Sequence, residues 1–155
     1  MSETFLNVYN KLINLSTNKD LYKYFTRQDT FSDRLLLMLF HFAFILKNFK
    51  NEENTKVLQE LYDFIFRQLE LSIREIGYGD QSINKKMKDY INLFHSILSE
   101  LHFWEKIQKN EKKKKLSSFL NDFNNIDYFL EYFEEFNLNL SKITLNSYLK
   151  SVNKQ

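Results

Sequence analysis

The chain has no proline and only two glycines, Gly77 and Gly79, among its 155 residues. Sandwiches and barrels need frequent turns built from these residues, and parallel α/β folds need Val/Ile-rich strands that this sequence lacks. Apolar residues instead recur at helical spacing along most of the chain. The sequence therefore predicts an all-α protein.

The helical spacing predicts one domain over residues 1–155, an irregular, orthogonal bundle of six to eight helices. The segment 32–49 is apolar nearly all round, which indicates a central helix packed on several sides. The lysine-rich run 109–115 is expected to be an exposed linker. The expected helices are 3–15, 18–25, 32–49, 55–76, one from 80–82 to about 109, and two or three shorter ones within the C-terminal residues 117–152. Asn124, with Asp127 three residues later, and Ser141 are the expected caps of these last helices.

No segment of the sequence reads as a signal peptide or a membrane span. The longest apolar stretch, 35–46, is interrupted by His41 and is shorter than the roughly 20 residues that cross a bilayer. The first residues carry Glu3 and no basic leader. There are no cysteines, so disulfides and thiolate metal sites are excluded. We expect a bacterial cytoplasmic protein, for which peripheral contact with the inner membrane is compatible with the sequence.

No pattern of catalytic residues stands out. The sequence has no glycine-rich phosphate loop and no nucleophile elbow. His95 and His102 lie seven residues apart, but neither has a carboxylate at a metal-binding Glu-x-x-His spacing. His41 interrupts the central helix and is expected to make a structural hydrogen bond, with a tyrosine as a candidate partner, rather than to bind heme or a metal. We expect no enzymatic activity, no cofactor and no metal.

Two motifs in the sequence are more specific. The first is Thr30-Phe31-Ser32-Asp33-Arg34-Leu35, which leads into the helix that carries His41. The second is the segment 71–80, Leu-Ser-Ile-Arg-Glu-Ile-Gly-Tyr-Gly-Asp, followed by Ile83, Lys85, Lys86, Met87 and Lys88. Together they resemble the ubiquinol–cytochrome c chaperone family over about residues 18–110. Tyr78 departs from the small aliphatic residue usual between the glycines, and the proline often found before the first motif is missing.

The resemblance implies a non-catalytic assembly factor that holds newly made cytochrome b of the ubiquinol–cytochrome c reductase (bc1) complex. Its mitochondrial relatives work with a small helical partner subunit near the ribosomal tunnel exit. In this sequence, Gly77 is expected to end a helix in the left-handed conformation and Gly79 to allow a tight reversal. Asp80 is expected to accept amide hydrogen bonds where the next helix begins.

Polar and charged residues of both motifs and of the helix between them are the candidates for partner binding. Arginines attract attention because only four occur among 22 basic residues, and their planar heads make contacts that lysine cannot. The alternative for the whole set is a solvated, purely structural surface. The candidates are Arg34, Arg67, Arg74, Glu75, Tyr78, Asp80, Lys85, Lys86 and Lys88.

Charge is distributed unevenly along the chain. Residues 84–115 hold nine lysines and four acids, whereas residues 119–136 hold five acids and no basic residue. The basic segment suits ribosomal RNA phosphates or anionic lipid headgroups, or else the two segments neutralise each other. No signature of sequence-specific nucleic-acid binding is present, and a small RNA-binding module ranks last among the functions considered.

Aromatic residues make up 17% of the chain. This abundance suggests a helix-lined apolar groove that receives a hydrophobic client segment. The alternative function is that of a helical carrier which binds a lipid or quinone in an aromatic interior.

Overall fold

The computed structural model describes residues 1–22, 31–120 and 125–154. These residues form eight α-helices and one 3-10 helix and contain no strand, which confirms the predicted all-α class. None of these helices is both long enough and apolar enough to cross a membrane. The elements are α1 (Ser2–Ser16), α2 (Lys19–Tyr22), α3 (Phe31–Phe49), α4 (Thr55–Ile76), α5 (Asp80–Leu101), η1 (Trp104–Lys106), α6 (Lys109–Phe119), α7 (Ile126–Ser141) and α8 (Leu145–Val152).

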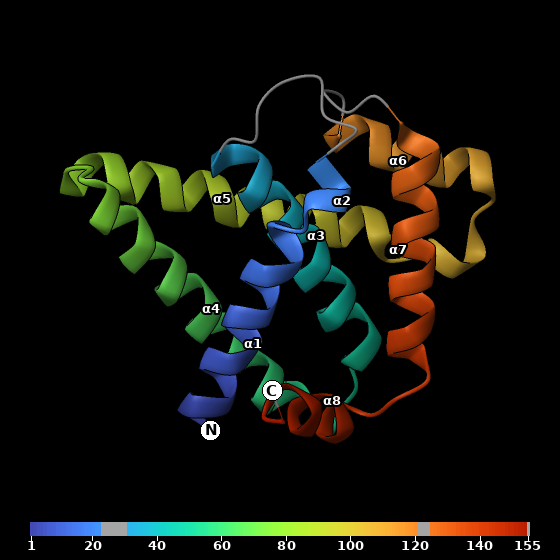
Figure 1. Cartoon of the computed structure of the whole chain (residues 1–155), viewed down its shortest axis with the longest axis horizontal. Helices are drawn as coiled ribbons and strands as arrows, with labels where there is room; N and C mark the ends of the chain where they lie inside the picture. Colours follow the sequence, from blue (N-terminus) through green and yellow to red (C-terminus); the bar gives the residue numbers. More distant parts are fainter. Residues whose placement is uncertain (23–30, 121–124, 155) are drawn as a thin grey trace.

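Helix α3 occupies the centre of the bundle, as its all-round apolar pattern predicts (Figure 1). Helices α1, α5 and α7 all pack against it. Phe42 stacks on Phe94 of α5 with ring centroids 5.3 Å apart, and Phe44 stacks on Phe133 of α7 at 5.4 Å. All four rings are fully buried, so the core is built from aromatic pairs that join α3 to its neighbours.

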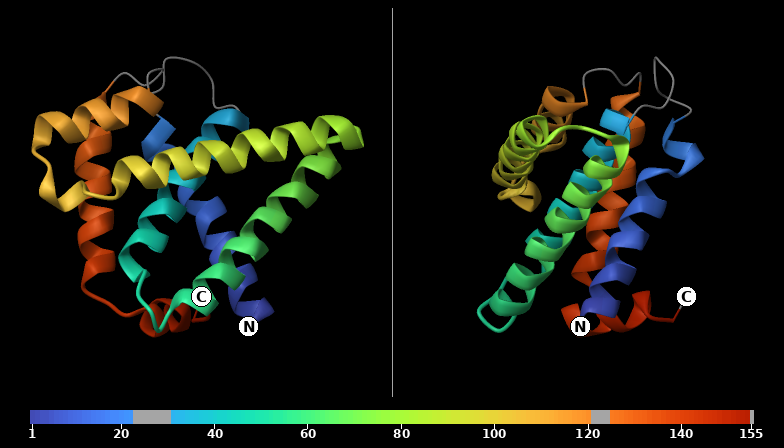
Figure 2. Two further views of the ribbon diagram at one scale, coloured as in Figure 1. Left: turned by 180° about the vertical axis from the view of Figure 1, so that it is seen from behind. Right: turned by 90° about the vertical axis from the view of Figure 1, so that its left-hand side faces the viewer.

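Helices α4 and α5 meet at a corner that projects from the body and then diverge towards α3 (Figures 1 and 2). Gly77 ends α4 at φ 103°, the left-handed conformation predicted for it. Gly79 has φ −73° and ψ 162°, a conformation open to any residue, so the reversal does not depend on its being glycine. Asp80 does not cap α5 with its side chain as expected, because its carboxylate binds Arg74 instead.

The prediction that residues 109–115 form an exposed linker is wrong, because this run opens helix α6. The expected long helix before it ends at Leu101, and the short 3-10 helix η1 separates the two. Lysine is a good helix former, and the buried Leu116 anchors α6 to the core. Lys112 and Lys113 also find acidic partners on α7, which removes much of the repulsion within the run.

The C-terminal helices close the bundle. The side chain of Asn125 caps α7 by accepting a hydrogen bond from the backbone N–H of Tyr128 at 3.1 Å. The predicted cap Asn124 lies outside the described residues, as do residues 23–30, which include the end of the expected helix 18–25. Ser141, also expected as a cap, ends α7, and Thr144 caps α8.

Helix α8 packs against α1, so the two ends of the chain lie close together (Figure 1). The side chain of Asn153 donates to Thr4 Oγ1 at 3.0 Å and accepts from Asn7 Nδ2 at 2.8 Å. Helices α1 and α8 therefore close the lower end of the bundle as it is seen in Figure 1.

Candidate docking surfaces

The corner between α4 and α5 carries most of the predicted partner-binding residues. Arg74 Nη1 lies 2.7 Å from Asp80 Oδ1, and Arg74 Nη2 lies 3.5 Å from Glu70 Oε1. The hydrogen bond to Asp80 raises the pKa of the Arg74 guanidinium. Arg74 thus joins two carboxylates on either side of the turn, a task for which a forked guanidinium is better suited than a lysine ammonium.

Most of the remaining predicted residues lie at or near the corner, and Arg34 does not. Tyr78 and Lys86 face each other at the corner, with the ammonium 4.5 Å from the ring centroid. Glu75, Lys85 and Lys88 are exposed beside them, and Arg67 is exposed on α4. Arg34 is exposed in the first turn of α3, and the start of this helix lies away from the corner between α4 and α5 (Figure 1).

The corner is apolar with balanced charge rather than basic. Leu71, Ile76 and Tyr78 are all exposed there. Residues 70–89 hold four basic and four acidic side chains, so the three lysines after the turn are offset by nearby carboxylates. A surface of this kind suits contact with another protein better than contact with phosphates.

A groove opens where α4 and α5 diverge, and we call it the α4–α5 groove. It has a volume of about 1070 Å³, and the end of α3 contributes to its lining. Phe103 lies at this groove with 56% of its surface exposed, and no Asp or Glu is among the described lining residues. The lining residues are Leu46, Lys47, Lys50, Thr55, Leu58, Gln59, Tyr62, His95, Leu98, Ser99, His102 and Phe103.

His95 of α5 and His102, the residue that follows α5, both line this groove. The hydroxyl of Tyr62 lies 3.0 Å from His95 Nε2. Partial burial, with a smaller contribution from Asp63, raises the pKa of Tyr62, which keeps this hydroxyl protonated. Within the described ranges, no three His, Cys, Asp or Glu side chains gather closely enough to hold a metal ion.

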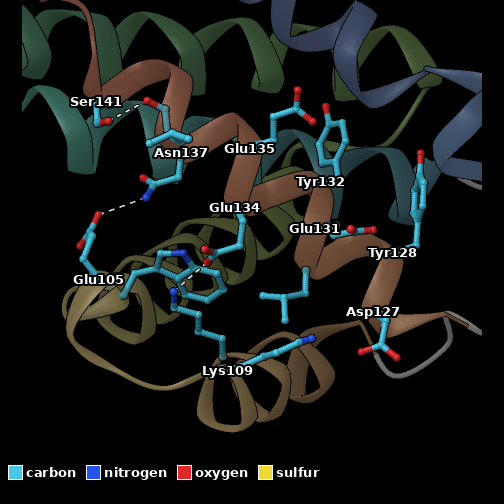
Figure 3. Close-up of a pocket in the computed structure, with 14 residues that line it drawn as sticks. Glu105, Lys109, Asp127, Tyr128, Glu131, Tyr132, Glu134, Glu135, Asn137 and Ser141 are labelled. Atoms are coloured by element: carbon cyan, nitrogen blue, oxygen red, sulfur yellow. Dashed lines mark hydrogen bonds and ion pairs between the residues drawn. The ribbon is translucent and has the colours of Figure 1, made fainter.

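A second groove, the α6–α7 groove, has a volume of about 1250 Å³ (Figure 3). Lys112 Nζ lies 2.9 Å from Glu134 Oε1 and 5.2 Å from the centroid of the Trp104 ring. Figure 3 shows Glu134 pointing from α7 towards α6. The lining residues are Trp104, Glu105, Lys109, Lys112, Asp127, Tyr128, Leu130, Glu131, Tyr132, Glu134, Glu135, Asn137, Leu138 and Ser141.

Ion pairs along this groove explain part of the uneven charge. Lys112 pairs with Glu134, and Lys113 Nζ lies 2.6 Å from Asp127 Oδ1, which lowers the pKa of that carboxyl. Lys115 pairs with Glu100 of α5. The basic and acidic segments therefore neutralise each other in part, which was the alternative interpretation of the sequence pattern.

The two grooves are adjacent at η1. Phe103 lines the α4–α5 groove, and the next residue, Trp104, lines the α6–α7 groove. Lys47 of the first groove is paired with Glu105 of the second, and Asn137 Nδ2 donates to the same carboxylate at 3.1 Å. Burial alone would raise the pKa of Glu105, but the hydrogen bonds from Lys47 and Asn137 outweigh it and lower that pKa. The sequence did not indicate either set of lining residues.

His41 has a structural role, as the sequence predicts. Its Nδ1 lies 2.7 Å from the carbonyl oxygen of Leu37, and its Nε2 lies 2.5 Å from the hydroxyl of Tyr132. Burial lowers the pKa of His41 to about 4, even though the bond to Leu37 acts in the opposite direction. Both ring nitrogens of a neutral imidazole are therefore occupied, which confirms the expected hydrogen bond to a tyrosine.

These features define a class: a helical protein whose described residues form two open grooves and an exposed apolar corner. The chain belongs to the ubiquinol–cytochrome C chaperone family, because the sequence pattern of that family matches residues 23–121. The matched segment includes α3 to α6, hence the corner and the whole α4–α5 groove, whereas α1, α7 and α8 lie outside it. Comparisons with curated proteins and with solved structures gave no significant match.

Proposed function

We propose that this protein is a non-catalytic assembly factor that holds newly made cytochrome b until it joins the bc1 complex. Membership of the ubiquinol–cytochrome C chaperone family supports a role in the assembly of that complex. A newly made membrane protein exposes apolar helices that need cover until they are assembled. The proposed client contact is therefore an apolar one.

The α4–α5 groove is the observation that supports this contact best. It is open, its lining comes entirely from the family-matched segment, and it carries four apolar side chains, Leu46, Leu58, Leu98 and Phe103. A helix that inserts apolar side chains into such a groove gains the burial of the exposed Phe103 ring as well. We propose that one apolar segment of cytochrome b lies along this groove.

The corner between α4 and α5 is the proposed site for a second protein, such as a small helical partner subunit or a ribosomal protein. Its exposed Ile76 and Tyr78 supply apolar contact, and Arg74 and Asp80 form a polar rim. Because charges within residues 70–89 balance, ribosomal RNA or an anionic membrane is the less favoured partner.

The test is a deletion strain complemented with variants. Loss of the gene is expected to lower the amounts of assembled bc1 complex and of heme-containing cytochrome b. Phe103→Asp is expected to complement poorly, and a photo-crosslinker at position 103 is expected to capture cytochrome b. Ile143→Asp, which changes an exposed apolar residue outside both grooves, is the matched control and is expected to complement fully. Normal levels of both products in the deletion strain would contradict the proposed function.

A lipid or quinone carrier is the alternative function. It needs an enclosed aromatic interior, but the described interior aromatics such as Phe42 and Phe44 are packed against other rings. Native mass spectrometry of the purified protein separates the two functions, because a carrier would retain a bound lipid.

A further inference from the structure

We propose that the α6–α7 groove binds a Lys/Arg-rich loop of the client, the loop that continues from the apolar segment held in the α4–α5 groove. This inference rests on the proposed function, because it takes the client to be a membrane protein. It assigns a binding role to α7, which lies outside the family-matched residues.

The chain's own Lys112 shows how a cation fits this groove. Its ammonium lies 2.9 Å from Glu134 Oε1 and 5.2 Å from the Trp104 ring centroid, so it makes an ion pair and a cation–π contact at once. A Lys or Arg of an incoming segment meets the same carboxylate and the same ring when the flexible Lys112 side chain moves aside.

Trp104 supplies a second indication of a peptide ligand. Its ring is fully buried and lines the groove, yet its indole Nε1 has no hydrogen-bond acceptor among the described residues. A buried N–H without a partner is costly, and a backbone carbonyl is the acceptor that a bound peptide offers. Displacement of Lys112 would bring such a carbonyl within reach.

Further carboxylates are available along α7. Glu131 and Glu135 are exposed and line the groove, and neither makes an ion pair with any described residue. They are one helical turn apart, a rise of about 6 Å, which is close to the roughly 6.6 Å between alternate residues of an extended loop segment. Three of the five acids in the described lining are already paired with lysines, so Glu131 and Glu135 supply the negative charge that is complementary to a basic segment.

The position of the groove identifies the part of the client that would fill it. The consecutive residues Phe103 and Trp104 line different grooves, so a segment leaving the apolar groove at η1 enters the acidic one. Membrane proteins carry an excess of Lys and Arg in the cytoplasmic loops that flank their membrane helices. An apolar helix of the client therefore fits the α4–α5 groove, and the basic loop that follows it fits the adjacent acidic α6–α7 groove.

The test uses the full chain and a synthetic peptide in which Lys alternates with Leu, so that an extended segment presents its lysines on one side. Trp104 is the only tryptophan in the chain, so a peptide in this groove is expected to change the intrinsic emission directly. The double variant Glu131→Gln/Glu135→Gln is expected to bind about 3- to 10-fold more weakly at low salt, because exposed ion pairs contribute modestly. Lys112→Met, which removes the internal competitor, is expected to bind more tightly.

The matched control is Glu52→Gln/Glu53→Gln, which removes two exposed acids between α3 and α4 that belong to neither groove. It is expected to bind the peptide like the unchanged protein. Equal affinity of the Glu131/Glu135 variant, or binding of a fluorescent peptide without a change in tryptophan emission, would overturn the proposal. An equal response to spermine would overturn it too, because the groove would then respond to any cation.

The two proposals can fail separately. Normal bc1 assembly in the deletion strain together with groove-dependent peptide binding would reject the client and leave a basic-peptide site. Defective assembly together with unchanged peptide affinity in the groove variants would leave the assembly role and reject this groove.

Discussion

The Tyr132 hydroxyl donates a hydrogen bond to Nε2 of His41 and so joins α7 to the central helix α3. The donor and acceptor are fixed by the other ring nitrogen, since Nδ1 faces the Leu37 carbonyl and must carry the proton. Burial raises the pKa of Tyr132, so the hydroxyl keeps its proton. A residue beyond the family-matched segment thus satisfies a polar group on the central helix, which lies within that segment.

Acid is expected to destabilise the protein through His41. Its pKa is about 4 when folded and about 6.5 when unfolded, so between these values the unfolded chain binds the proton more readily. The free energy of unfolding therefore falls as the pH drops from 6.5 towards 4, in total by roughly 3 kcal/mol from this group. Urea unfolding at pH 7.5 and 4.5 measures most of this loss.

His41→Gln provides the control for this pH dependence, because glutamine does not titrate in this range. The variant is expected to be less stable at pH 7.5 but to lose less stability on acidification. An equal loss in both proteins would show that other groups cause the acid sensitivity.

Removal of the Tyr132 hydroxyl is expected to destabilise the fold. Tyr132→Phe keeps the ring contacts with Phe133 and Phe136 but leaves His41 Nε2 buried without its partner. An unsatisfied buried polar group costs about 1–3 kcal/mol. Tyr78→Phe removes an exposed phenol and is expected to leave the midpoint of denaturant unfolding unchanged, so similar shifts in both variants would contradict the assignment.

The two glycines of the corner are expected to differ in their tolerance of alanine. Nothing lies within 4 Å of a Cβ built on either residue, so only the backbone distinguishes them. Gly77→Ala places a side chain at φ 103° and is expected to cost about 1–2 kcal/mol. Gly79→Ala, at φ −73°, is expected to be neutral or slightly stabilising. Thermal unfolding of the two variants gives the comparison, and equal midpoints would show that the turn relaxes.

Removal of α8 tests whether residues 1–155 form one domain. The helix buries Leu145, Tyr148, Leu149 and Val152, and each such side chain contributes about 1.5–3 kcal/mol. Their sum approaches the entire stability of a typical domain, about 5–15 kcal/mol. A chain ending at residue 143 is expected to lose its cooperative thermal transition, whereas one ending at Val152 is expected to keep it. A cooperative transition in the shorter chain would show that α8 is an appendage.

The helices that the sequence predicts best are those with an unambiguous local signal. Helix α4 spans the expected residues 55–76. Its end is predictable because Gly77 adopts the left-handed conformation that terminates a helix. The sequence wrongly predicts a linker at the lysine-rich start of α6, because the partners that neutralise Lys112 and Lys113 come from α7, later in the chain. A local pattern does not show such partners.

The candidate site was predictable only in part, for a similar reason. The corner residues are close in sequence, so their motif indicates them together, and Arg74 does meet Asp80. The linings of the grooves combine side chains from several helices, and only the packing angles of α4, α5 and α7 bring them together. The sequence predicts a tyrosine as the partner of His41, but nothing in the pattern distinguishes Tyr132 from the other tyrosines.

The contact between α1 and α8 forms late in the synthesis and folding of this protein. Asn153 bonds with residues 146 and 149 positions earlier in the chain. While the chain is being synthesised, α1 leaves the ribosome long before α8 exists, and contacts this distant in sequence close slowly. A protein proposed to shelter an unfinished client thus spends part of its own synthesis with the α8-facing side of α1 uncovered.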